Sequence, residues 1–281
     1  MNPNISLERI EQLRAQFGQN TPLLQQYWHW LSGALRGDLQ WSSSHQEPVV
    51  KSIARALPNT VKLMGLAYCT SLLGGIALGT WQGTREGKPL QRASTAITFT
   101  MFALPDFWIA MLLQLVFVTL LGWFPSGGTS SFNPNFSTAE KFFDQLHHLA
   151  LPWLALTLVD VAVFARYQRV AMRGIAGQHF LRTARAKGVP ERLITWKHAL
   201  RVAVLPMITI AGLYFPALLV GAIITETVFG WQGVGRLLTK AIENRDYFLV
   251  SGIVVVGSAM TAMGSILADL TREFVDPRLR A

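Results

Sequence analysis

Apolar residues gather in five long runs, and polar residues gather between them. The runs cover about residues 57–82, 93–121, 149–167, 204–229 and 247–270. A helix needs roughly 20 apolar residues to cross about 30 Å of hydrocarbon, and each run comes close to or exceeds that length. Lipid offers no partner for backbone polar groups, so a spanning segment must be helical. The pattern predicts an all-α, polytopic membrane protein with about five transmembrane helices.

The first 56 residues differ from the rest because they are mixed polar. Apolar side chains recur at helical spacing from Leu7 to Phe17 and again from Leu23 to Leu35. This spacing predicts two short amphipathic helices, separated near residues 18–22. The chain therefore divides into an amphipathic N-terminal region, 1–56, and a transmembrane domain, 57–281. Region 1–56 either packs as a cap on the membrane domain or contacts an external partner.

Proline and glycine indicate where the spans bend or pack closely. Pro105 lies inside the long second run and predicts a kink or a strong tilt. Pro152 is placed in the first turn of the third span. Gly74, Gly75 and Gly79 in the first span allow another helix to approach closely.

Basic residues lie between the spans, mostly on one side. The formal net charge is +9. If the spans alternate in direction, one side holds three Lys/Arg in residues 83–92, nine in 166–201 and three after residue 270. Cytoplasmic loops are enriched in Lys and Arg, so this side is predicted to be cytoplasmic, with the C-terminus inside and region 1–56 outside. A nucleic-acid binder would instead spread its cations along one face among aromatics, so no nucleic-acid partner is expected.

The sequence predicts no catalytic residues, no cofactor and no metal site. The segment Gly83–Pro89 resembles a phosphate-binding loop only in composition: three residues, not four, separate its glycines, and Pro follows the lysine where Ser or Thr is needed. His147 and His148 are adjacent and so do not share a helix face. The single cysteine, Cys69, lies in an apolar run and is expected to be a small buried side chain.

The polar segment 168–201 contains a pattern typical of helix, break and helix. Thr183 to Lys187 are followed by Gly188, which suits a left-handed helix cap, and Pro190 and Glu191 suit the first turn of the next helix. A short basic helix of this kind can enter a groove on a partner protein. It can also lie on anionic lipid headgroups. The residues themselves favour neither interpretation.

This segment resembles the cytoplasmic loop of binding-protein-dependent ABC permeases of the dipeptide, oligopeptide and nickel branch. Family members carry the sequence Glu-Ala-Ala, followed after three residues by Gly and later by a Leu-Pro pair. The corresponding positions here are Arg182-Thr183-Ala184, Gly188 and Leu205-Pro206. The acid is lost and the gap from Gly to Pro is longer, as in the peptide branch. Similar stretches follow in order along the chain: Gly37-Asp38-Leu39, Leu57-Pro58-Asn59-Thr60, Leu104–Trp108, Glu226–Phe229, Gly233–Leu237, Asn244–Tyr247 and Asp276–Arg280.

The resemblance implies a permease subunit of an ATP-driven importer in the bacterial inner membrane. Its partners would be ATP-binding subunits inside, a second and different permease chain, and an external solute-binding protein. The contact with the ATPase would be made by the cytoplasmic coupling helix: Thr183, Ala184, Arg185, Ala186, Lys187 and Gly188. The family's usual first transmembrane helix has no counterpart here, which fits an N-terminal region that is external without a preceding span.

Three acidic residues fall within the predicted spans and are candidates for a translocation pathway. Ionised side chains are costly in lipid and therefore face a cavity, a partner or a polar neighbour. Asp160 lies in mid-span, Asp106 follows Pro105 and can cap a broken helix, and Glu226 lies near an outer end. Each can also serve a structural contact, which is the favoured interpretation for Glu226.

The cargo expected from the resemblance is a peptide. The same machine carrying nickel or another small solute, such as an opine, is the first alternative. A secondary transporter or channel is the second, but the inverted repeats typical of such proteins are not evident. A membrane enzyme lacks a recognisable set of nucleophile, base or metal ligands.

Overall fold

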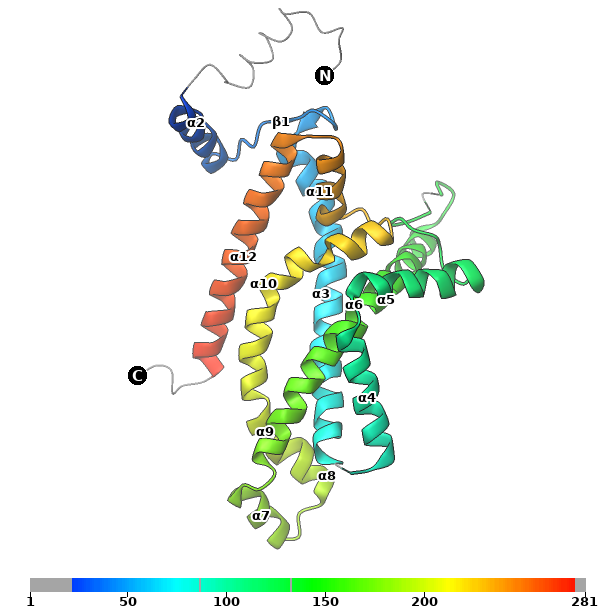
Figure 1. Cartoon of the computed structure of the whole chain (residues 1–281), viewed down its shortest axis with the longest axis vertical. Coiled ribbons are helices and arrows are strands. Elements are labelled where there is room, and N and C mark those ends of the chain that lie inside the picture. Colours follow the sequence, from blue (N-terminus) through cyan, green and yellow to red (C-terminus); the bar gives the residue numbers. More distant parts are fainter. Residues whose placement is uncertain (1–21, 86, 132, 276–281) are drawn as a thin grey trace, which may run out of the picture.

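The computed structural model describes residues 22–85, 87–131 and 133–275, and most of these residues are helical (Figure 1). The elements are α2 (Leu23–Leu35), β1 (Trp41–Ser42), β2 (Glu47–Pro48), α3 (Val49–Thr84), α4 (Pro89–Ala103), α5 (Asp106–Leu113), the π-helical η1 (Gln114–Leu120), α6 (Thr138–Ile175), α7 (His179–Ala186), α8 (Glu191–Leu193), the π-helical η2 (Ile194–Ala199), α9 (Leu200–Ala203), α10 (Leu205–Val228), α11 (Val234–Glu243) and α12 (Tyr247–Val275). Strands β1 and β2 form one antiparallel hairpin.

The helices have the length and surface of membrane spans. In the described part of the chain, α3, α6 and α12 are each long and apolar enough to cross a membrane, and two bent helix pairs raise the number to five if each pair is one span. Leu73, Ile97 and Ile266 are 59–69% exposed and belong to three different helices. Large apolar side chains on the outer faces of spanning helices are suited to contact lipid. The predicted all-α polytopic fold is confirmed.

The two ends of the molecule along its long axis are built from different elements (Figure 1). At one end, here named the hairpin end, lie the β-hairpin, α11 and the start of α12. At the other, named the α7 end, lie α7, α8 and the turn between α3 and α4. At the hairpin end a cluster of Leu39, Val49, Leu249 and Ile253 joins the chain before the first span to the start of the last.

Helices α3 and α6 pack extensively against each other, and glycine allows their close approach. Gly75, Gly79 and Gly83 recur every four residues on the face of α3 that meets α6. A Cβ atom on Gly79 would lie 2.7 Å from the Cβ of Gln168, and one on Gly83 would lie 2.7 Å from the Cβ of Met172. These distances are too short for real carbon atoms, so only glycine fits. The predicted close packing at Gly75 and Gly79 is confirmed.

The second predicted span breaks at Pro105. A kink or tilt within one helix was expected, but α4 and α5 meet at an angle of 106°. Leu104 and Pro105 are extended, with ψ angles of 141° and 139°. The proline ring disfavours helical backbone at the residue before it, which ends α4. The two halves therefore run in different directions (Figure 1).

The third span is much longer than its apolar run. Ser137 caps the start of α6: its hydroxyl accepts from the Glu140 N–H, and the Glu140 carboxylate accepts from the Ser137 N–H at 2.7 Å. This reciprocal capping box starts the helix eleven residues before the predicted residue 149. Pro152 consequently lies deep inside α6, and its placement in the first turn was wrong.

Other boundaries also differ from the sequence prediction. Helix α3 begins at Val49, so Pro58 lies inside it. Residues 230–246, which separate the last two predicted spans, contain α11, and the hairpin was not predicted. The second N-terminal helix exists as α2, whereas the helix predicted from Leu7 to Phe17 and the C-terminal motif at 276–280 lie outside the described residues.

Candidate functional site

Helix α7 and the turn after it form a rigid projection at the α7 end (Figure 1). Gly188 has a φ of +76°, as predicted for a left-handed cap. Its N–H donates to the Arg185 carbonyl at 2.9 Å, and the Val189 N–H donates to the Ala184 carbonyl at 3.2 Å. These two bonds form a Schellman motif, which satisfies the last carbonyls of the helix. The helix therefore ends at a defined turn before α8.

The underside of α7 is seated in an apolar cluster. Leu181 and Ala184 are buried against Met172 of α6, Ile194 of η2 and Ala203 of α9. Because α9 leads directly into α10, one packed core connects α7 to two long helices. Helix α7 is therefore packed against α6 and is connected through α9 to α10.

The opposite face of α7 is open. Of the six predicted coupling residues, Ala184 is buried, and the exposed ones are Thr183, Arg185, Ala186, Lys187 and Gly188. Arg185 Nε donates to a Glu191 carboxylate oxygen at 2.6 Å, which links the two sides of the turn. This bond raises the pKa of the Arg185 guanidinium. The pair is exposed, so it orders the turn more than it stabilises the fold.

Glu226 organises a junction between three helices near the hairpin end. Its carboxylate accepts from the Thr60 hydroxyl at 2.7 Å and from the Arg236 N–H at 3.0 Å. Gly233 and Gly235 allow this, because a Cβ on Gly233 would overlap the carboxylate. Glu226 thus joins α10 to α3 and to the start of α11.

The same junction is completed by the residues beside Thr60. The Asn59 amide donates to the Gln232 carbonyl at 2.8 Å, and the Trp231 indole N–H donates to the Asn59 carbonyl at 3.0 Å. The Thr60 hydroxyl also accepts from the Val234 N–H at 2.8 Å. Two motifs noted separately in the sequence, Leu57–Thr60 and Glu226–Leu237, therefore meet in space.

Asp246 holds the hairpin against the last helix. One carboxylate oxygen accepts from the Ser42 hydroxyl at 2.6 Å and from the Ser44 N–H and hydroxyl at 2.9 and 2.7 Å. The other accepts from the Leu249 N–H at 3.2 Å and caps α12. Burial opposes the charge of Asp246, but these hydrogen bonds prevail and lower its pKa.

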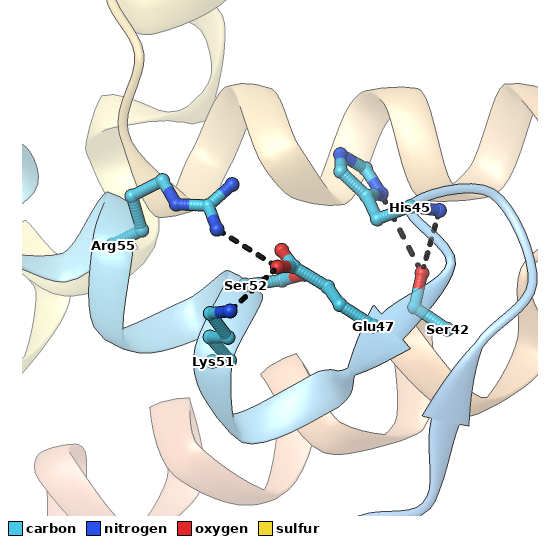
Figure 2. Close-up of polar contacts among 6 residues, drawn as sticks. All are labelled: Ser42, His45, Glu47, Lys51, Ser52 and Arg55. Atoms are coloured by element: carbon cyan, nitrogen blue, oxygen red, sulfur yellow. Dashed lines mark hydrogen bonds and ion pairs between the residues drawn. The ribbon is translucent and has the colours of Figure 1, made fainter.

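A second carboxylate orders the base of the hairpin (Figure 2). Glu47 accepts from the Ser52 hydroxyl at 2.7 Å and from Arg55 Nη2 at 2.8 Å, and Lys51 Nζ lies 4.0 Å away. The bond from Ser52, followed by the influence of Arg55, lowers the pKa of Glu47. Figure 2 also shows His45 bonded to Ser42 beside this group. His45 contacts serines rather than the carboxylates, so the cluster does not have the connectivity of a catalytic triad.

The three acidic residues predicted for the pathway do not form one group. Asp160 is buried in α6, and the Asp106 carboxylate lies within electrostatic range of it. Asp106 is the exposed first residue of α5, and the N-cap position before it is occupied by Pro105, so Asp106 is not the N-cap. Glu226 lies apart from both in the junction with Thr60.

The sequence did not reveal the roles of Glu47 and Asp246. The only signals were the Ser42–Ser44 run and the Asn244–Tyr247 motif, and neither identifies the other as its partner. In the described ranges, no three His, Cys, Asp or Glu side chains gather in a way that could hold a metal ion.

Comparison with known proteins gives consistent matches. A family model described as "Binding-protein-dependent transport system inner membrane component" matches residues 75–281, which include α7 and Glu226. The oligopeptide transport system permease protein AppB of Bacillus subtilis (strain 168) is 37% identical and aligns over 99% of this chain and 87% of its own length. The dipeptide transport system permease protein DppB of Escherichia coli (strain K12) is 33% identical over 98% of this chain and 86% of its own.

Solved structures share the fold at low sequence identity. An inward-facing structure of the MetNI methionine ABC transporter matches with a TM-score of 0.64 at 16% identity, over 80% of this chain and 96% of that one. An amino acid ABC transporter matches with a TM-score of 0.59 at 17% identity, over 79% of this chain and 94% of that one. At these identities the similarity concerns the fold alone.

Proposed function

This chain belongs to the family of binding-protein-dependent transport system inner membrane components, and we propose that it is one of two membrane subunits of an ATP-driven peptide importer. The names of its relatives, which are oligopeptide, dipeptide and glutathione permeases at 33–37% identity, support a peptide cargo. Separate ATP-binding subunits would hydrolyse ATP, and an external binding protein would deliver the solute. The chain itself would move the solute without changing it.

The observation that carries this proposal is the seating of α7. Its exposed face carries Arg185 and Lys187, its end is fixed by the Gly188 turn, and its buried face belongs to the core of α6 and α9. A rigid helix of this kind can fill a groove on an ATPase subunit and transmit the movement of that subunit to the spans. The basic segments around it support a cytoplasmic position.

The path of that movement follows packed helices. Helix α7 contacts α6 through Met172, and α6 contacts α3 along the glycine stripe at Gly75, Gly79 and Gly83. A displacement of α7 would therefore move α6 and α3 together rather than bend one alone. At the far end, the Glu226 junction connects α3 with α10 and would carry the change to the outer face. Asp160 and Asp106 remain our candidates for residues that face the solute.

The experiment that tests the coupling role changes Gly188 in two ways. Gly188→Val places a β-branched residue at positive φ, which costs about 1–3 kcal/mol and should distort the turn. Gly188→Asn adds a side chain of similar size but tolerates this conformation. An added Cβ meets nothing within 4 Å, so the two variants differ chiefly in their tolerance of the positive φ.

We expect the Val variant to lose co-purification with the ATPase subunit and the Asn variant to keep it. If both variants kept the ATPase subunit to the same extent, or both lost it to the same extent, the coupling role would be contradicted. Peptide uptake by vesicles that contain the chain but no ATPase subunit would identify a secondary carrier instead. Nickel uptake, with no uptake of peptides, would preserve the coupling role but refute the proposed cargo.

A further inference from the structure

A cavity of about 770 Å³ lies at the α7 end, between the turn that joins α3 to α4 and the segment from α7 to η2. The end of α3 contributes Trp81, Gly83 and Thr84, and the following turn contributes Arg85 and Lys88. All of these residues except Trp81 belong to the segment Gly83–Pro89, whose sequence does not match a phosphate-binding loop. In the structure, this segment instead forms one wall of the cavity.

The wall of the cavity is strongly cationic. Its basic residues are Arg85, Lys88, Arg185 and Arg192, and its acidic residue is Glu191. Glu191 is already paired with Arg185 at 2.6 Å. Among the described residues, no carboxylate pairs with Arg85, Lys88 or Arg192; Glu86 lies outside them. Among the described lining residues, four are basic and one is acidic, so this part of the wall has an excess of positive charge.

The floor and rim of the cavity are apolar. Met172, Leu181 and Ile194 are at most 2% exposed and also line the hollow. Trp81 is half-buried on the α3 side, and Trp196 is 46% exposed on the η2 side. Tryptophan is enriched where membrane meets water, and here it marks the end of a spanning helix. The cavity thus has buried apolar side chains beneath it and basic side chains in its wall, and it lies at the end of a candidate membrane-spanning helix, α3.

We propose that this cavity binds the phosphate group of an anionic phospholipid. Arg85, Lys88 and Arg192 would contact the phosphate, while Trp81 and Trp196 would contact the adjoining glycerol and acyl chains. A free phosphate ion would use the cations but leave the two tryptophans without a ligand. The proposal holds for any cargo and requires no ATPase subunit.

The site also lies against the proposed coupling segment. Arg192 follows directly from Glu191, which holds Arg185 and hence the Gly188 turn. A bound anion at Arg192 would therefore fix the position of α8 relative to the end of α3. Lipid composition would in this way influence how firmly α7 is held.

The test uses the full chain purified in detergent and titrated with dioleoylphosphatidylglycerol, with binding followed by native mass spectrometry. The double variant Arg85→Gln/Lys88→Gln removes two wall cations. Since each basic residue near a lipid phosphate contributes a factor of about five, we expect affinity to fall about thirtyfold. The matched variant Arg36→Gln/Lys62→Gln removes one Arg and one Lys that do not line the cavity, and its affinity should equal that of the wild type.

Four further experiments distinguish the possible ligands. The proposal would be overturned if dioleoylphosphatidylcholine bound as tightly as phosphatidylglycerol. It would also be overturned if the two double variants had equal effects on lipid affinity. Displacement of the lipid by millimolar inorganic phosphate would show a free-anion site and would also overturn it. So would loss of the ATPase subunit from the Arg85→Gln/Lys88→Gln variant without any change in lipid binding, because the cavity would then be a protein interface. A photoactivatable phosphatidylglycerol is expected to label residues 81–88 and 191–199, and labelling confined to other segments would refute the site.

Discussion

The glycine stripe between α3 and α6 offers a sharp test of the packing, because one substitution has opposite expected effects at two positions of the same helix. Gly79→Ala adds a Cβ that would lie 2.7 Å from Gln168 Cβ and 3.0 Å from the Arg169 backbone nitrogen. Gly65→Ala adds the same atom where nothing lies within 4 Å. Both glycines lie in the interior of α3, so their helix propensities change equally.

The magnitudes follow from two competing effects. Replacing Gly by Ala inside a helix stabilises by about 0.5–1 kcal/mol. Overpacking costs about 1–3 kcal/mol, and the upper end applies at Gly79 because the neighbour is backbone, which cannot change rotamer. We therefore expect Gly79→Ala to destabilise the protein by about 2 kcal/mol and Gly65→Ala to stabilise it by up to about 1 kcal/mol.

The assay is the midpoint of thermal unfolding in detergent, measured for both variants and the wild type. Gly79→Ala should unfold at a lower temperature than the wild type, and Gly65→Ala at the same or a higher one. A Gly79→Ala variant at least as stable as the wild type would refute the close packing of α3 on α6. Equal destabilisation by both variants would show that the effect does not come from this contact.

Three predictions concern the hairpin end. Asp246→Asn leaves the donors of Ser42 and Ser44 without their charged acceptor. We therefore expect the free energy of unfolding to fall by about 2 kcal/mol and amide exchange in residues 42–48 to become faster. Unchanged exchange would contradict the role of Asp246 in holding the hairpin. Because the pKa values of Asp246 and Glu47 are lowered, their stabilisation is complete above the ordinary carboxyl pKa and is lost as pH falls through the lower folded values. Exchange in this segment should therefore accelerate only below about pH 4, and an onset near pH 6 would implicate a histidine instead. Gly235→Ala places a Cβ 2.6 Å from Ile223 Cα and should cost about 2–3 kcal/mol in a denaturation assay, whereas Gly257→Ala, with open space around it, should not.

The sequence predicted those features that depend on local composition. Apolar runs located the membrane helices, and Gly188 followed by Pro190 located the turn after α7. Gly79 was recognised as a packing position because small residues in a span allow close approach. The break at Pro105 was only partly anticipated, since the sequence signals a disturbance but not its angle of 106°.

Features that depend on long-range contacts were not predictable. Ser42 and Asp246 are 204 residues apart, and no local pattern in either segment signals the pairing. The extension of α6 was missed because charged residues and histidines interrupt the apolar pattern in residues 138–148, although Ser137 and Glu140 carry the spacing of a capping box. Glu226 was correctly singled out as an acid near a span end, but its bonds to Thr60 and Arg236 come from tertiary structure.

The central claim is that α7 faces the cytoplasm and binds a separate ATPase subunit, and cysteine labelling in intact cells tests it most directly. In a Cys69→Ser background, Thr183→Cys is expected to resist a membrane-impermeant maleimide until the cells are opened, and then to cross-link to the ATPase subunit. Ser43→Cys, at the hairpin end, is expected to react in intact cells. Labelling of position 183 from outside, with position 43 protected, would contradict the account.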